Sequence, residues 1–521
     1  MRRADAGEAL RSLVSRLYTG EQHIAGDRGE RGEAERIAGV LEEALGSTVD
    51  LVETPTLSWR PGPVEVHPEP PFSAALPYTL DSDVEARAYP VQGDASHPVA
   101  WRRFPEGRIA VASEPPDPDD IEAVALLASE SGASALLVES PLPRIIVTKG
   151  AWGYSHSSGA PTPIPVIVVP RGYYSMLGPG REVSVKTSAS LEESVSYTLS
   201  LDIGGREPQV VVGAHFDRWF TGFQDDILGV AQAAVAASIL SDLGYSVRLL
   251  VFSSEEHGAP GPAGWYWAWG SRFYAGQLVS SGLNCSFRVY VNFDVAGSGK
   301  LLISGSPQYV GLSGFKERCC ECPECDSFQL ASAGVPTISI HSLWTEEIKE
   351  LYHTPRDTPE AHDPGQAVAA VMESVRLVRE GPRWEAFSAR LASWLGRGPL
   401  LARRAYYVLE ALSRRVGWET LYCEAARRFL KAVHYGSYRL EDSHLEAQWF
   451  PEVVAYKRLL GDARRGRAPR EVWISGEERL LYVASDAAGR SLHPARLGEQ
   501  ARHQLYRLNG EVEEMREALV R

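Results

Sequence analysis

The chain has 521 residues, of which 44% are hydrophobic and 23% are charged, and this ordinary globular composition excludes wholesale disorder and fibrous repeats. Its formal net charge of −14 argues against a protein that mainly binds nucleic acid, because contact with phosphates needs a basic surface. At roughly 100–200 residues per domain, the length predicts several domains.

No apolar run approaches the roughly 20 residues that a membrane-spanning helix needs, so we predict no membrane segment. The first residues lead into a charged helical pattern instead of the apolar core of a signal sequence. We therefore expect a cytoplasmic protein.

The first part of the chain predicts a helix followed by a strand. Apolar residues recur at helical spacing within 31–45, Gly46 ends this helix, and 49–57 has the pattern of a strand. A proline-rich stretch at 61–71 follows, which we interpret as a crossing point between domains.

The rest of the chain divides into three parts. Residues 74–188 have the pattern of a small α/β module without a catalytic cluster. In 190–380, short β-branched apolar strands alternate with helices, which predicts a mostly parallel sheet covered on both faces. After Pro382 the pattern is that of long helices rich in Arg and Leu, with a hairpin at 471–485 and a final helix from 499.

Ionisable side chains follow the strands of the predicted parallel sheet. They are His215 and Asp217 after the first strand, Asp225 and Asp226 soon afterwards, Glu255 and Glu256 after the second, Asp294 after the third, and His353 after the fourth. We expect these side chains to lie together, because ligands bind outside the carboxyl ends of such strands. Neighbouring buried carboxylates repel each other unless a cation neutralises them, so the pattern predicts a metal site.

Two histidines and three carboxylates form a ligand set that suits Zn²⁺ or a similar ion. Five ligands are too many for one open tetrahedral site, but they suit two ions that share a carboxylate and act together in hydrolysis. The remaining carboxylate, Glu255, lies beside a ligand and is free to move protons. The residues therefore predict metal-assisted hydrolysis but do not identify the bond that is cleaved.

Four ordered motifs resemble those of the co-catalytic di-zinc aminopeptidases, and they look closest to the glutamate carboxypeptidase II branch of that family. The motifs are Gly213–Asp226, Ser254–Gly258, Asn292–Asp294 and Tyr352–Thr358. The segment Cys325–Phe328 followed by Ala333–Pro336 also resembles this family. The resemblance covers 190–375 together with the helix and strand at 31–57.

The resemblance implies a set of metal ligands. Asp225 would bridge two Zn²⁺ ions, for which Co²⁺ or Mn²⁺ are alternatives. The remaining ligands would be His215 and Asp294 on one ion, and Glu256 and His353 on the other.

It also implies roles for residues that do not bind metal. Glu255 would act as general base and then as general acid. Asp217 would orient the ring of His215, and Asp226 would follow a cis peptide bond. Tyr352 would donate to the oxyanion, with an aromatic plug under the loop as the alternative.

The implied fold class is α/β, with a doubly wound, mostly parallel sheet. Residues 1–62 and 189–382 would form the catalytic domain, and a protease-associated domain at 63–188 would cover the cleft. Residues 383–521 would be mostly helical and would occupy the place of the helices that hold the homodimer together in the glutamate carboxypeptidase branch.

The chain departs from the family pattern at three places. An aromatic insertion at Trp265–Trp269 either walls a substrate pocket or packs against the neighbouring module or a second subunit. Ile227 and Leu228 stand where the family usually has small residues, and they either narrow the site or pack at a helix start. The cluster Cys319–Cys325 is a poor zinc cage and would hold either a disulfide staple or free thiols.

The leading prediction is a di-zinc exopeptidase that acts on peptides, above all an aminopeptidase. A carboxypeptidase or dipeptidase is the alternative, and it would need an arginine such as Arg218, Arg272 or Arg356 to bind the terminal carboxylate. Cyclisation of amino-terminal glutamine needs a single zinc, and the presence of both His215 and Asp294 argues against it. A non-catalytic, receptor-like scaffold would have lost ligands, whereas this chain has the whole set.

Overall fold

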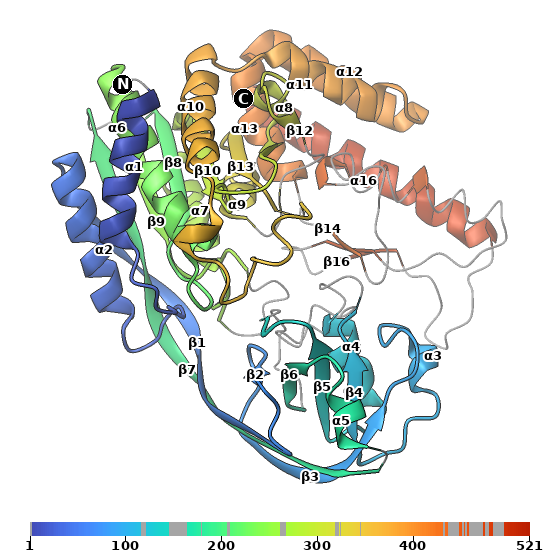
Figure 1. Cartoon of the computed structure of the whole chain (residues 1–521). Coiled ribbons are helices and arrows are strands. Elements are labelled where there is room, and N and C mark those ends of the chain that lie inside the picture. The colour runs from blue at the N-terminus through green and yellow to red at the C-terminus, as the bar shows by residue number, and fades with distance from the viewer. Residues whose placement is uncertain are drawn as a thin grey trace.

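The structure is a computed structural model. It describes residues 3–115, 121–144, 164–178, 180–205, 209–260, 267–317, 322, 325–343, 345–430, 433–435, 448–450, 453, 456–457, 472–474, 479–482 and 494–520. Figure 1 shows a central sheet flanked by helices, with a smaller α/β module below it and long helices of the C-terminal region above it.

The central sheet runs in the order β12-β11-β13-β10-β8-β9-β7, and β1 pairs with β7. Its strands are β1 (Asp50–His67), β7 (Glu182–Ile203), β8 (Val210–His215), β9 (Val247–Phe252), β10 (Val289–Asp294), β11 (Leu302–Gly305), β12 (Lys316–Glu317) and β13 (Thr337–His341). The pairs β9–β8, β8–β10 and β10–β13 are parallel. The carboxyl ends of these four strands therefore lie along one edge of the sheet.

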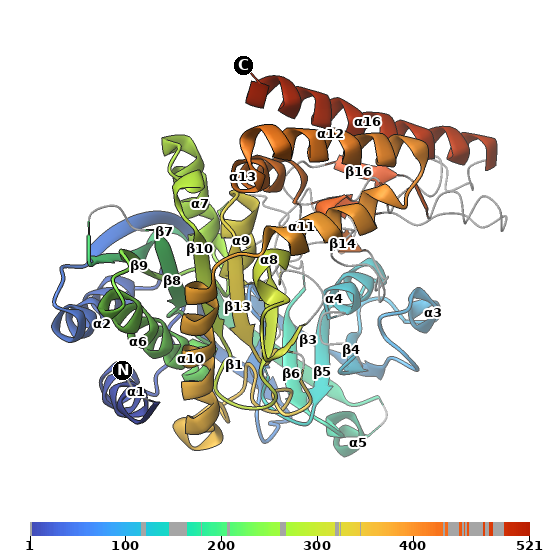
Figure 2. The same ribbon diagram turned by 90° about the horizontal axis from the view of Figure 1, so that it is seen from above.

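Helices cover both faces of this sheet, as Figure 2 shows from above. One face carries α1 (Arg3–Leu17), α2 (Glu30–Leu45), α6 (Leu228–Asp242) and α10 (Pro364–Glu380), and the other carries α7 (Trp269–Ser281) and α9 (Asp326–Ser332); α8 (Pro307–Val310) follows β11. Val210 and Val212 pack on the α6 side, whereas Val211 packs on the α7 side. This alternation explains why the strands are apolar throughout, and the predicted α/β class with a mostly parallel sheet is confirmed.

One helical stretch in the described part of the chain, Phe223–Asp242, has the length and hydropathy of a membrane span. However, 94% of its apolar window is buried inside the protein, where α6 contacts α1, α10 and β8. Its hydrophobicity therefore serves the core of this domain.

We call the strands β2–β6 and the helices α3–α5 the inserted module. They are β2 (Ala74–Ala75), β3 (Ser82–Pro90), β4 (Ile109–Ser113), β5 (Ala135–Ser140), β6 (Val166–Pro170), α3 (Pro98–Trp101), α4 (Ile121–Glu130) and α5 (Tyr173–Leu177). The antiparallel pair β1–β7 leads from the central sheet into this module, and β7 also pairs with β3 (Figure 1). The module is thus joined to the central sheet by continuous strands.

The strand β1 is longer than the predicted strand at 49–57, because it continues through Pro61 and Pro63 to His67. Prolines are tolerated on an edge strand, where the missing N–H need not enter a ladder, and the pairing register shifts between Pro61 and Val64. The predicted domain boundaries at 62/63 and 188/189 fall within β1 and β7.

The C-terminal region has a hydrophobic core of its own, which packs against Phe328 and Ala331 of α9. Its elements are α11 (Trp384–Leu391), α12 (Leu400–Val416), α13 (Trp418–Phe429), β14 (Val433–Tyr435), β15 (Val472–Ile474), β16 (Arg479–Tyr482) and α16 (Pro494–Val520). Figure 2 shows α12 and α16 side by side. The expected hairpin corresponds to the antiparallel pair β15–β16.

Two disulfides join cysteines of the described chain, Cys322 with Cys325 and Cys285 with Cys423. The first agrees with the disulfide alternative for the cysteine cluster, whose members Cys319 and Cys320 lie outside the described residues. Since disulfides are rare in cytosolic proteins other than those of hyperthermophiles, the two pairs do not support the cytoplasmic location, which stays a prediction.

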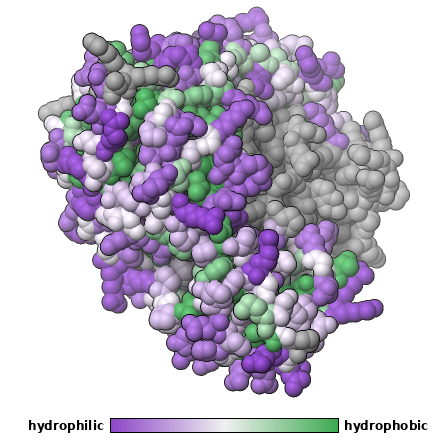
Figure 3. Space-filling model, in the orientation of Figure 1, coloured by the Kyte–Doolittle hydropathy of each residue, from purple (hydrophilic) through white to green (hydrophobic). Residues whose placement is uncertain are grey.

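The face of the molecule seen in Figure 3 is mostly hydrophilic, with hydrophobic residues in small groups between the polar ones. This distribution is ordinary for a globular protein surface.

Candidate metal centre

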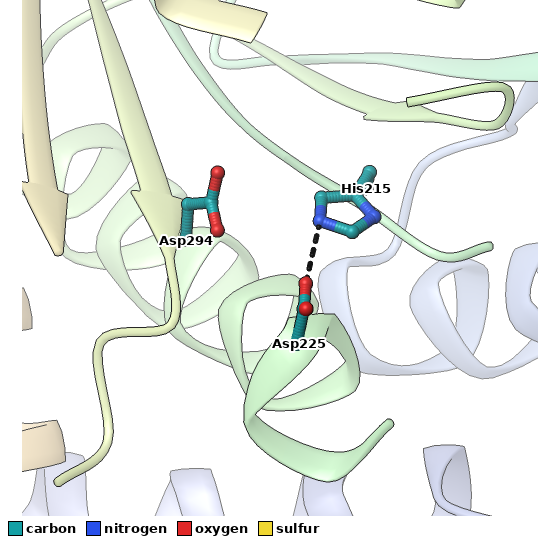
Figure 4. A group of neighbouring side chains, drawn as sticks. All are labelled: His215, Asp225 and Asp294. Atoms are coloured by element: carbon teal, nitrogen blue, oxygen red, sulfur yellow. Dashed lines mark ion pairs between the residues drawn. The ribbon is translucent and has the colours of Figure 1, made fainter. Parts of the chain in front are cut away.

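The structure brings the five predicted ligands together at the carboxyl edge of the parallel strands. They form two buried groups that share one aspartate, His215 with Asp225 and Asp294, and Asp225 with Glu256 and His353. Within each group the potential ligand atoms lie within 4.8 Å of one another. Figure 4 shows the first group: His215 comes from the end of β8, Asp294 from the end of β10, and Asp225 from the segment before α6.

The two carboxylate oxygens of Asp225 face different histidines. Nε2 of His215 lies 3.2 Å from Oδ1 of Asp225, and Nε2 of His353 lies 3.2 Å from Oδ2. The same nitrogen of His353 lies 3.0 Å from Oε2 of Glu256. Asp225 is therefore placed between the two groups, as a bridging carboxylate would be.

The hydrogen bonds of His215 indicate that this site suits a cation. Its Nδ1 donates to the backbone carbonyl of Asp217 at 3.0 Å, so Nε2 is the nitrogen that faces Asp225. Nε2 of His215 and Oδ2 of Asp225 are buried and have no hydrogen-bond partner among the described residues. Buried carboxylates this close together repel unless a cation neutralises them, and two histidines with three carboxylates fit Zn²⁺.

The pKa values of the carboxyl groups show the same excess of negative charge. Burial, together with neighbouring carboxylates, raises the pKa of Asp294 to about 8 and that of Glu256 to about 7. Burial also raises the pKa of Glu255 well above its usual value. For His353, burial lowers the pKa, but the charges of Glu256 and Asp225 outweigh it and raise the pKa to about 10. Each raised pKa favours the protonated form of its group, so each one lowers the net negative charge of the metal-free site. Bound divalent cations would neutralise the same negative charge.

We expect the metal-free protein to lose stability as the pH rises. The pKa values of Glu256, Asp294 and Asp326 are about 7, 8 and 7 in the folded chain, against about 4 when unfolded. The stability that these groups contribute is present below about pH 4 and is lost as the pH rises through 7 to 8. Asp225, whose pKa is lowered, acts in the opposite direction only at low pH.

The measurement is the thermal midpoint of EDTA-treated protein at about pH 5 and about pH 8, with and without added zinc. The midpoint of the metal-free protein should be lower at the higher pH, and zinc should raise it more there. A metal-free protein that is more stable at pH 8 than at pH 5 would contradict this electrostatic description.

Asp217 holds the site in two ways. Its backbone carbonyl contacts His215, whereas its carboxylate Oδ1 lies 3.6 Å from the same Nδ1. The carboxylate accepts hydrogen bonds from the backbone N–H groups of Glu255 at 3.2 Å and Glu256 at 3.1 Å. Asp217 thus orients the loop of the two glutamates as well as the histidine ring, a wider role than the resemblance implied.

Two further residues support the ligands through hydrogen bonds and a third acts on the site through its charge, and the sequence analysis assigned none of them a role. Asp357 accepts hydrogen bonds from the backbone N–H groups of Gln224 and Asp225. Trp219 donates from Nε1 to Oε2 of Glu256 at 3.0 Å. Asp326 is a buried carboxyl group whose pKa is raised to about 7, chiefly by burial. All three residues lie within the quoted motifs and segment, and this is the signal that could have marked them.

The remaining predicted residues are also placed at the site. The peptide bond between Asp225 and Asp226 is cis, and Oδ2 of Asp226 accepts from the backbone N–H of His215 at 3.2 Å. The ring of Tyr352 stacks on that of His353 at 3.8 Å. Burial and the charge of Asp225 raise the pKa of Tyr352 well above its usual value, so its hydroxyl keeps its proton and can donate.

The departures from the family pattern are packing features in the described chain. Ile227 and Leu228 are buried in the core around α6. Trp267 and Trp269 pack against an aromatic cluster around Trp59. Trp265 lies outside the described residues.

Comparison with known proteins connects this geometry to a family. Residues 199–308 match the model of peptidase family M28. This segment of the chain is similar to the M28 peptidases. It holds Glu255 and all of the predicted metal ligands except His353, which lies beyond it.

Solved structures share the fold of this chain over most of its length. A zinc aminopeptidase from Bacillus subtilis is 19% identical, with a TM-score of 0.57 and coverage of 72% of this chain and 95% of that one. An aminopeptidase from Aneurinibacillus sp. strain AM-1 is 18% identical, with a TM-score of 0.51 and coverage of 73% and 94%. A peptidase M28 precursor from Shewanella amazonensis is 17% identical, with a TM-score of 0.55 and coverage of 71% and 91%. No curated protein matches the chain significantly.

Proposed function

We propose that this protein is a di-zinc exopeptidase that removes residues from the amino terminus of peptides. The observation that carries the proposal is the pair of buried ligand groups that share Asp225. Two similar structures are named as an aminopeptidase and a zinc aminopeptidase. These names support zinc as the metal and the amino terminus as the end of the peptide that is attacked.

The residues of the chain have distinct tasks in this reaction. A pair of zinc ions, when bound, supplies Lewis-acid chemistry that activates water and polarises the scissile carbonyl. Glu255 accepts the proton of the attacking water and delivers it to the leaving amine, and its raised pKa suits a group that holds a proton between these steps. The hydroxyl of Tyr352 donates a hydrogen bond to the oxyanion of the tetrahedral intermediate.

The arginines considered for a carboxypeptidase support the amino-terminal alternative. Arg218 is buried and bound to Glu33 at 2.9 Å, and it also donates to backbone carbonyls, so it belongs to the scaffold. Arg356 is exposed and pairs with Glu350. Arg272 stacks over Trp269 at 5.0 Å. Among the described residues, Arg218 and Arg356 are paired with glutamates, and a site rich in carboxylates attracts an ammonium group more than a carboxylate.

The test is digestion of matched peptides by the zinc-loaded protein. We expect release of the first residue from a peptide with a free amino terminus, and no release when that amine is acetylated. An amidated carboxyl terminus should make no difference. Release of the last residue, or cleavage of the acetylated peptide alone, would favour the carboxypeptidase or dipeptidase alternative.

A homodimer through the C-terminal helices stays a prediction, and so does the identification of the inserted module as a protease-associated domain. Sedimentation of the full chain tests the first of these. A monomer at micromolar concentration would contradict it.

A further inference from the structure

The loop Ser254–Gly258 carries both Glu255 and Glu256, and several segments hold its backbone. Asp217 accepts from two of its N–H groups. The N–H of Leu57 in β1 donates to the carbonyl of Gly258 at 2.8 Å. The N–H groups of 268 and 269, at the start of α7, donate to the carbonyls of Glu255 and Ser254. All of these partners belong to the central sheet or to the helices and loops next to it, and none belongs to the inserted module.

One further partner of the loop comes from the inserted module. The N–H of Gly258 donates to the hydroxyl oxygen of Tyr78 at 3.1 Å. Tyr78 lies between β2 and β3, and its side chain is fully buried. The module therefore reaches the catalytic loop two residues from a metal ligand.

The position of Tyr78 is fixed by contacts of the next residue with β1 and with its own module. The next residue, Thr79, accepts from Nε1 of Trp59 at 2.9 Å through its backbone carbonyl. The hydroxyl of Thr79 donates to the carbonyl of Val166, the first residue of β6, at 3.2 Å. A displacement of β6 would thus be passed to Tyr78 and from there to Gly258.

Aromatic rings continue this connection to the metal ligand itself. The ring of Tyr78 lies 6.0 Å from that of His257 and 6.5 Å from that of Trp59. The ring centroid of Trp219 lies 5.2 Å from that of His257 and 6.2 Å from that of Trp59. Trp219 in turn donates to Glu256. The four rings form one buried group between the module and the ligand.

The loop needs such support because its backbone is unusual. Ser254 has a φ of 60° and Gly258 a φ of 117°, and a Cβ at Gly258 would lie 2.8 Å from Cγ2 of Thr56. Conformations of this kind persist only where the surroundings hold them. Loss of one contact should therefore move the two glutamates.

We propose that Tyr78 is a positioning residue through which the inserted module holds Glu255 and Glu256 in their catalytic geometry. The expected effect on kcat rests on the proposed peptidase function. The expected effect on the position of Glu256 does not. The proposal assigns the module a part in catalysis that does not depend on contact with substrate.

The test is Tyr78→Phe, which keeps the ring and removes the hydroxyl. We expect kcat to fall about three- to tenfold, the factor that one hydrogen bond is worth, while KM for a short substrate changes less than about twofold. The visible absorption spectrum of the Co²⁺-loaded variant should also change, because Glu256 shifts relative to the metal. Tyr173→Phe is the matched control, since Tyr173 is a buried tyrosine of the same module whose hydroxyl bonds to the carbonyl of Pro68.

The control should keep the wild-type kcat and Co²⁺ spectrum even if its thermal midpoint falls. A Tyr78→Phe protein with the wild-type spectrum and kcat would overturn the proposal. So would equal losses of kcat in both variants, which would mark a merely structural effect. If the wild-type protein cleaves no peptide, the proposed function fails, and the Co²⁺ spectra alone still decide the role of Tyr78.

Discussion

Replacement of Glu255 by glutamine should abolish most of the peptidase activity while leaving the metals bound. Glu255 is not a member of either ligand group, yet its loop places it beside them, and loss of a general base costs about 10²–10⁴-fold in kcat. Since Glu255 lies buried among other carboxylates that raise its pKa, the neutral glutamine should not destabilise the metal-free fold. The measurement combines kcat with zinc content by elemental analysis.

The matched control for this variant is Glu346→Gln, at an exposed position, which should be indistinguishable from wild type. Near-wild-type turnover in Glu255→Gln would exclude Glu255 as the proton carrier. A variant that has lost its zinc would instead show that Glu255 is needed for metal binding.

Replacement of Asp225 by asparagine should damage both metal positions at once. Each oxygen of Asp225 faces one of the two histidines, and an amide nitrogen cannot take the place of a carboxylate oxygen as a ligand. Metal chemistry contributes several kcal/mol of transition-state stabilisation, so we expect kcat to fall by about 10³-fold or more. Zinc content should fall below two ions per chain.

Asp242→Asn serves as the control, because Asp242 is an exposed aspartate at the far end of the helix that follows Asp225. It should retain both activity and zinc. Two tightly bound zinc ions in the Asp225→Asn protein would show that this carboxylate does not join the two sites.

The ligand set could be predicted from the sequence because of a simple property of parallel sheets. The strands β8, β9 and β10 are apolar throughout, so they are recognisable, and the residues that follow them must emerge at one edge. The positions of His215, Glu256 and Asp294 follow from this rule without knowledge of any side-chain contact. Asp225 and His353 stand further from the ends of their strands, but they were predicted at the same edge, and the resemblance then assigned each of the five ligands to an ion.

The supporting contacts could not be predicted in the same way. Tyr78 and Gly258 are 180 residues apart, and Cys285 and Cys423 are 138 apart, so neither pair leaves a local pattern. The hydrogen bond from Trp219 to Glu256 depends on the direction of an indole ring, which the surrounding packing decides. Contacts of this kind arise only once the domains have assembled.

The paired strands β1 and β7 have a mechanical consequence. Their backbone hydrogen bonds run from Asp50 and Ser200 to His67 and Ser184. The connection between the central sheet and the module is therefore a stiff pair of strands and not a flexible linker. A wide swing of the module, like a hinged lid, would require this pair of strands to bend or break. Substrate should accordingly reach the site without a large displacement of the module.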